Sequence, residues 1–203
     1  MIPRNRVVVP AIIATFLLCT ATPAAAHSAE GLSGGFFAGF LHPVSGFDHV
    51  LAMVAVGLWG AFLGRPLIGL LPVIFPTVMA FGGVLGMMGA AMAPVEIGIA
   101  VSVLALGTAV ALHWRAPIWI ASLAVGIFAV FHGYAHGAEL PSMADPVAFS
   151  AGFVVATGML HVLGIVIGLI ASRPAGTAVV RALGASIALA GIYYLLVAAR
   201  FIT

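Results

Sequence analysis

LIGLLPVIFPTVMAFGGVLGMMGAAMA, residues 67–93, is an uninterrupted apolar run without a charged side chain. A transmembrane α-helix needs about 20 consecutive apolar residues to cross a hydrocarbon core of about 30 Å, and this run is long enough. A transmembrane β-strand would instead alternate apolar with polar side chains. The stretch therefore predicts an all-α fold, a polytopic helical membrane bundle.

The composition of the whole chain agrees with a membrane protein. Of the 203 residues, 64% are hydrophobic and only 6% are charged, with a mean hydropathy of +1.28. Soluble domains carry about 25% charged residues, so a soluble globular protein is excluded. The basic residues are all arginines, so the lysine of a Walker-type phosphate loop is missing. We expect a lipid bilayer as the surrounding partner and no nucleic acid.

The N-terminal residues 1–26 are typical of a secretory signal peptide. Arg4 and Arg6 precede a short apolar stretch, and Ala24-Ala25-Ala26 provides an A-x-A cleavage site. The alternative is a first transmembrane helix that stays attached. Residues 27–203 are then expected to form a single transmembrane helical domain. Cys19, the one cysteine, falls in the predicted peptide, so the mature chain would offer no thiolate ligand.

Six apolar segments follow, at residues 45–64, 67–93, 95–112, 117–137, 147–171 and 178–199. Arginines follow the first, third and fifth segments, and acidic residues follow the second and fourth. Because arginine-bearing loops stay in the cytoplasm, we predict a bacterial inner-membrane protein with a periplasmic mature N-terminus. An odd number of spans, with one segment re-entrant, is the alternative. The charged residues concerned are Arg65, Arg115, Arg173 and Arg181 against Glu96, Glu139 and Asp145.

The first polar motif, His-Pro-Val-Ser-Gly-Phe-Asp-His at residues 42–49, lies where the first segment begins. Ionisable residues within a membrane are costly and usually functional. On a regular helix His42 and His49 would share a face about 10 Å apart, so one ion could not bind both and Asp48. Either Ser45-Gly46 breaks the helix, or these residues are successive stations on a path. A purely structural alternative has His42 capping the helix and Asp48 pairing with an arginine.

The second polar motif is Phe-His-Gly-Tyr-Ala-His-Gly-Ala-Glu at residues 131–139. His132 and His136 are spaced i and i+4 and therefore lie on one helix face, with Glu139 three residues further on. This spacing lets two imidazoles hold one divalent ion beside a carboxylate. The alternative is a pair of interfacial histidines hydrogen-bonded to the backbone.

Both motifs fall at the same predicted end of the bundle, and Glu96 begins the third segment at that end too. His161, midway along the fifth segment, is either a deeper station or a neutral imidazole hydrogen-bonded between helices. Imidazole and carboxylate ligands without thiolate suit a borderline divalent transition metal, but they do not separate Ni²⁺ from Co²⁺ or Zn²⁺. The ion is expected as a transported substrate, and no prosthetic group is expected.

At these two motifs the chain resembles the HupE/UreJ family of bacterial nickel permeases and accessory proteins. The family's His, five residues, Asp-His pattern is met within residues 42–49, and its Phe-His-Gly-x-Ala-x-Gly-x-Glu pattern at residues 131–139. The resemblance covers nearly the whole chain. It implies Ni²⁺ uptake for hydrogenase or urease maturation, with Co²⁺ handled by some members and nickel-enzyme maturation proteins as partners.

The resemblance also implies which residues hold the metal. By their positions in the family motifs, the metal ligands are expected to be His42, Asp48, His49, His132 and Glu139. Glu96 is also predicted as a ligand, although no tight motif surrounds it. The prediction of His136 as a ligand depends on the helical spacing alone.

The expected function is thus a divalent-metal permease and not an enzyme. One alternative is an intramembrane zinc-dependent hydrolase, since His and Asp clusters in multispan proteins can hold a catalytic Zn²⁺ with an open water position. Another is an accessory subunit that hands metal to an enzyme without transporting it. Metal accumulation in vesicles separates the permease from both.

Overall fold

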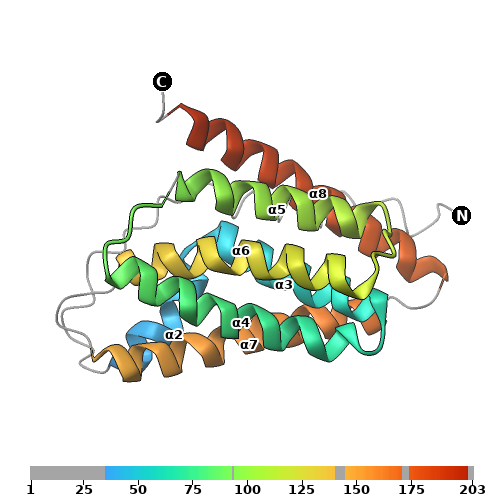
Figure 1. Cartoon of the computed structure of the whole chain (residues 1–203). Helices are drawn as coiled ribbons and strands as arrows, with labels where there is room; N and C mark the ends of the chain where they lie inside the picture. Colours follow the sequence, from blue (N-terminus) through green and yellow to red (C-terminus); the bar gives the residue numbers. More distant parts are fainter. Residues whose placement is uncertain (1–34, 93, 140–144, 171–173, 201–203) are drawn as a thin grey trace, which may run out of the picture. The chain divides into compact units, whose positions relative to one another are not determined.

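All regular elements in the described part of the chain are α-helices, which confirms the all-α prediction (Figure 1). The structure is a computed structural model that describes residues 35–92, 94–139, 145–170 and 174–200. The predicted signal peptide lies outside these residues. The helices are α2 (Gly35–Ser45), α3 (Phe47–Leu63), α4 (Leu67–Met87), α5 (Val95–Ala111), α6 (Ile118–Ala138), α7 (Pro146–Ile170) and α8 (Pro174–Ala199).

Each of the six predicted apolar segments overlaps one of the helices α3 to α8, but fewer than six helices are long enough to cross a bilayer alone. Helices α4, α6, α7 and α8 have the length and hydropathy of single spans. The pair α2 and α3, bent by 83°, provides a fifth if it forms one broken span. Helices α3 and α5 have 17 residues each, or about 26 Å at 1.5 Å per residue. The described helices therefore provide four or five candidate spans rather than six, and the bent pair fits the alternative of one re-entrant segment.

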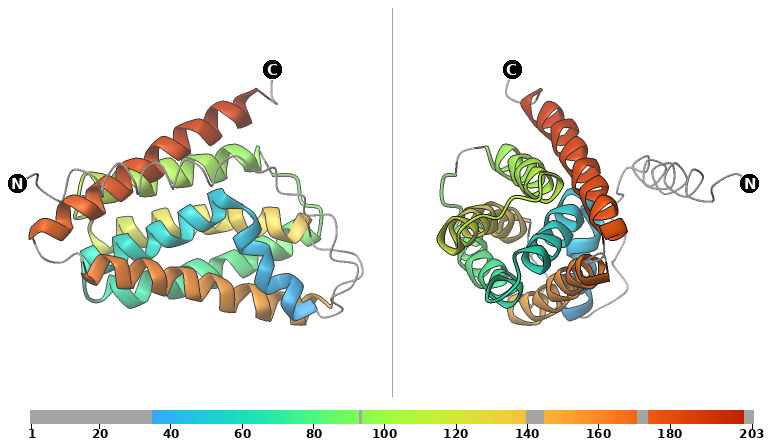
Figure 2. Two further views of the ribbon diagram at one scale, coloured as in Figure 1. Left: turned by 180° about the vertical axis from the view of Figure 1, so that it is seen from behind. Right: turned by 90° about the vertical axis from the view of Figure 1, so that its right-hand side faces the viewer.

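The bend between α2 and α3 occurs at the predicted Ser45-Gly46 break and is visible in Figure 2. The Ser45 hydroxyl donates to the His42 carbonyl at 2.6 Å, and Gly46 then turns to extended backbone with φ −99° and ψ 111°. Helix α3 begins one residue later, with Asp48 in its first turn, where a carboxylate is favoured by the helix dipole. The bend therefore gives the helix that carries His42 a different direction from the helix that carries Asp48 and His49.

Glycines allow the helix backbones to approach closely, as is common between membrane helices. The most extensive contacts are those of α4 with α6, α5 with α8, α3 with α7 and α2 with α7. Between α4 and α6, a Cβ on Gly82 would collide with the Val130 carbonyl oxygen, and one on Gly133 with the Met79 carbonyl oxygen. Because Gly133 follows His132 directly, this close approach also sets the rotation of the helix that carries the second motif.

We predict that Gly82→Ala lowers the free energy of unfolding by about 1–3 kcal/mol, because the added methyl overpacks a backbone-to-backbone contact. The control is Gly69→Ala on the same helix, where a Cβ would have nothing within 4 Å. Thermal midpoints in detergent should fall for the first variant and hold or rise slightly for the second. Equal midpoints for both would contradict this view of the α4–α6 contact.

The end of the bundle where α5 meets α6 is basic. The Arg115 guanidinium lies 5.5 Å from the Phe62 ring centroid, and Arg181 Nε donates to the Ala111 carbonyl at 2.9 Å. His113 also contacts Phe62, with ring centroids 3.5 Å apart, and burial together with the two arginines lowers its pKa. His113 therefore lies at the interface predicted to face the cytoplasm, away from the two polar motifs.

Candidate metal centre

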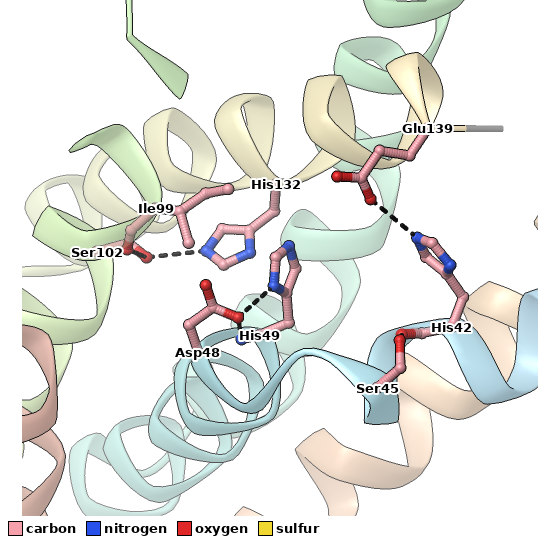
Figure 3. A network of polar contacts seen from close by, with 8 residues as sticks. All are labelled: His42, Ser45, Asp48, His49, Ile99, Ser102, His132 and Glu139. Carbon is pink, nitrogen blue, oxygen red and sulfur yellow. Dashed lines mark hydrogen bonds and ion pairs between the residues drawn. The ribbon is translucent and has the colours of Figure 1, made fainter. Parts of the chain in front are cut away.

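Six of the seven predicted site residues meet where α2 ends, α3 begins and α6 ends. Figure 3 shows all of them except His136. His42 is in the last turn of α2, whereas Asp48 and His49 are in the first turn of α3. His132 and His136 are on the final turns of α6, and Glu139 follows as its C-terminal cap. The bend at Gly46 is what brings residues from both halves of the first motif to the same helix.

The four histidines of this cluster form a row. The ring centroids are 4.8 Å apart for His42 and His136, 4.3 Å for His136 and His49, and 4.7 Å for His49 and His132. Each ring thus contacts the next, and His136 of the second motif lies between His42 and His49 of the first. The i, i+4 spacing on α6 places His132 one turn deeper in the bundle than His136.

The outer group consists of His42, His136 and Glu139. One ligand atom from each lies within 4.8 Å of the others, which is close enough for a single ion. His42 Nε2 is 3.5 Å from Glu139 Oε2, and this contact holds the pKa of the Glu139 carboxyl below its ordinary value. Glu139 therefore stays ionised and supplies negative charge at the exposed end of the row.

The inner group consists of Asp48, His49 and His132. Asp48 Oδ1 is 2.7 Å from His49 Nδ1 and also accepts the His49 backbone N–H at 2.8 Å. An ionised carboxylate only accepts hydrogen bonds, so His49 Nδ1 carries a proton, and in the neutral imidazole Nε2 keeps its lone pair. Within the described residues, Asp48 pairs with this histidine and not with an arginine.

Four imidazole nitrogens of the row are buried without a hydrogen-bond partner among the described residues. They are His49 Nε2, His132 Nδ1 and both ring nitrogens of His136. Leaving a buried polar group unpaired costs about 1–3 kcal/mol. A divalent ion would use such nitrogens as ligands, and the carboxylates of Asp48 and Glu139 would balance its charge. The donor set therefore fits a divalent transition metal.

The seventh predicted residue, Glu96, stands apart from the row. It lies in the first turn of α5 with an exposed side chain, and it interacts electrostatically with Asp48, His49 and Glu139. Its position adds negative charge to this end of the bundle. Within the described residues it is not part of the group whose ligand atoms converge.

His161 is fully buried in α7, one aromatic ring away from the cluster. The Phe75 centroid is 5.5 Å from that of His132 and 5.3 Å from that of His161. Neither nitrogen of His161 has a hydrogen-bond partner in the part of the chain that the structure describes. The alternative of an imidazole hydrogen-bonded between helices is therefore not what the structure shows.

Sequence reasoning did not identify the residues that surround the row. Phe149 and Phe153 of α7 pack against it, with Phe153 centred 4.3 Å from His136 and Phe149 5.4 Å from His42. Ser102 of α5 contacts His132 at 2.8 Å. Two phenylalanines and a serine inside apolar helices carry no sequence signal that distinguishes them from ordinary packing residues.

The fold and the cluster together define a multi-pass helical membrane protein with an imidazole and carboxylate centre at one end. The family model described as HupE / UreJ protein matches residues 15–194. The chain belongs to the HupE/UreJ family, as its motifs indicated. It is 47% identical over 180 residues to Protein HupE of Rhizobium leguminosarum bv. viciae, covering 88% of this chain and 94% of that protein. No solved structure matches the chain.

Proposed function

We propose that this protein is an inner-membrane permease for a divalent transition metal, with Ni²⁺ as the first substrate and Co²⁺ as the second. The observation that carries the proposal is the row of four touching imidazoles flanked by the carboxylates of Asp48 and Glu139. Buried unpaired nitrogens beside two negative charges are costly in a membrane unless a cation uses them. Ni²⁺ comes first because the family motifs point to nickel supply for hydrogenase or urease maturation.

The distribution of charge supports an inward route. The cluster is at the end that carries Glu96 and Glu139, and the opposite end carries Arg115 and Arg181. Because arginine-bearing loops face the cytoplasm, the cluster opens toward the periplasm. A doubly charged ion then gains roughly 4.6 kcal/mol on entering a cell at a potential of 100 mV. That driving force requires no ATPase.

The row also suggests how an ion moves. The outer group offers ligands at the exposed end, and His136 contacts both His42 and His49. An ion can therefore exchange ligands from the outer to the inner group through one shared imidazole. Conduction favours several weak sites over a single tight one, because each site must release what it binds.

The decisive experiment is uptake by the purified protein in liposomes. We expect radioactive nickel to accumulate when the interior is negative, with none in protein-free liposomes and little when the potential is reversed. Competition with Co²⁺ and Zn²⁺ ranks the substrates. Binding without accumulation would instead support a metal-handover subunit, and zinc-dependent cleavage of a peptide or ester would support a hydrolase.

If the route continues deeper into the bundle, His161→Leu should reduce metal uptake. This substitution removes both ring nitrogens and leaves an apolar side chain of similar size. If the ion passes from the inner group to His161, maximal uptake should fall by about tenfold or more, the effect of about 1.4 kcal/mol on a barrier. Equilibrium binding by the detergent-solubilised variant should match the wild type. Unchanged uptake at equal protein level would remove His161 from the route.

A further inference from the structure

Ser102 is a fully buried residue of α5 that connects this helix to the histidine row (Figure 3). Its Oγ lies 2.6 Å from the carbonyl oxygen of Ile99 and 2.8 Å from His132 Nε2. Neither family motif contains this serine. Its two contacts determine where the imidazole proton of His132 resides.

A serine hydroxyl has one hydrogen to donate. Two oxygens only 2.6 Å apart repel each other unless a hydrogen lies between them, so the Ser102 hydroxyl donates to the Ile99 carbonyl. The Ser102 oxygen must then accept at its second contact, and the donor is His132 Nε2–H. Because a neutral imidazole carries a single N–H, His132 Nδ1 keeps its lone pair.

This lone pair faces the inner group. The rings of His132 and His49 meet edge to face with centroids 4.7 Å apart, and Figure 3 shows the second His132 nitrogen turned toward His49. His132 Nδ1 has no hydrogen-bond partner among the described residues. His49 is oriented in the complementary way, since Asp48 holds its Nδ1 and leaves Nε2 open.

We propose that Ser102 is a positioning residue that holds His132 in the Nε2–H tautomer, so that Nδ1 is the atom offered to the divalent ion. The inference rests on the proposed function in that it takes the cluster to bind such an ion. Metal-ligating histidines commonly donate their other ring N–H to an oxygen, which fixes both the tautomer and the ring orientation. Here that oxygen comes from a helix that adds no ligand to either group.

Variants test the role through binding of Ni²⁺ measured by calorimetry in detergent. Removing an oxygen that orients a ligand typically weakens metal binding by about 10–100-fold, and we expect a loss of this size for Ser102→Ala. Ser102→Thr keeps a hydroxyl that can donate to the preceding turn, so this variant should retain most of the wild-type affinity for Ni²⁺. The control is Thr108→Val on the same helix, which removes a hydroxyl that donates to the Leu104 carbonyl at 2.7 Å.

A double-mutant cycle separates positioning from general packing. In a His132→Ala background, Ser102→Ala should cause no further loss of affinity, because its effect acts through the missing imidazole. An additional loss of the same size as in the wild-type background would show that Ser102 acts through packing and would overturn the proposal.

The tautomer is also measurable without any variant at Ser102. Histidine is labelled with ¹⁵N, and the signals of His132 are identified as those lost in His132→Ala. Before metal is added, Nε2 of His132 should carry the proton. Zn²⁺, a diamagnetic probe, should then shift Nδ1 more than Nε2. A protonated Nδ1, or metal bound through Nε2, would overturn the role of Ser102 while leaving the permease intact. A wild-type protein that binds no divalent ion would overturn the proposed function itself.

Discussion

His136→Ala is expected to abolish high-affinity metal binding and uptake, the largest loss for any single side chain of the cluster. His136 contacts the rings of both His42 and His49, and both of its nitrogens are buried without partners in the described structure. Its removal takes a ligand from the outer group and breaks the row between the two groups. Removing a residue that only orients a ligand weakens metal binding by up to about 100-fold, and we expect a larger loss of metal affinity here.

Calorimetry with Ni²⁺ in detergent and uptake by liposomes measure this effect. The matched control is His113→Ala, the same substitution at a histidine that packs against Phe62 at the opposite end. That control should bind and transport as the wild type does. If His136→Ala transports normally at equal protein level, the row is not the route of the ion.

Asp48→Asn should cause the second largest loss of metal binding and uptake. The substitution removes the negative charge of the side chain and nearly preserves its shape. Asparagine keeps an oxygen that can accept from the His49 backbone N–H, as Asp48 does at 2.8 Å, so the start of α3 is preserved. The negative charge that balances the ion beside His49 and His132 is lost. Inside a membrane protein an uncompensated charge is expensive, so we expect uptake to fall to background and binding to weaken by at least about tenfold.

The control for charge is Asp145→Asn, which retains the capping function of a side chain that accepts from the Val147 and Ala148 backbone N–H groups at the start of α7. Nearly normal uptake is expected there. Comparable loss in both variants would indicate a general electrostatic effect of acidic residues at this end rather than a specific role for Asp48.

The helices and the residue types at the centre follow from local features of the chain. Continuous apolar runs specify membrane helices whatever their neighbours are, because a backbone in lipid must satisfy its own hydrogen bonds. The spacing of His132 and His136 likewise guarantees a shared face. The break at Ser45-Gly46 was one of two open alternatives, since a glycine weakens a helix without forcing it to end.

Contacts between helices depend on how each helix is rotated, and rotation is set by packing over the whole interface. The contacts of Glu139 with His42 and of Ser102 with His132 are of this kind. Which glycines lie backbone to backbone, as Gly82 does against Val130, determines which way the histidines of α6 face. Local sequence therefore specifies the helices and the ligand types, whereas the division into outer and inner groups, and the nitrogen that each imidazole offers, arise from tertiary packing.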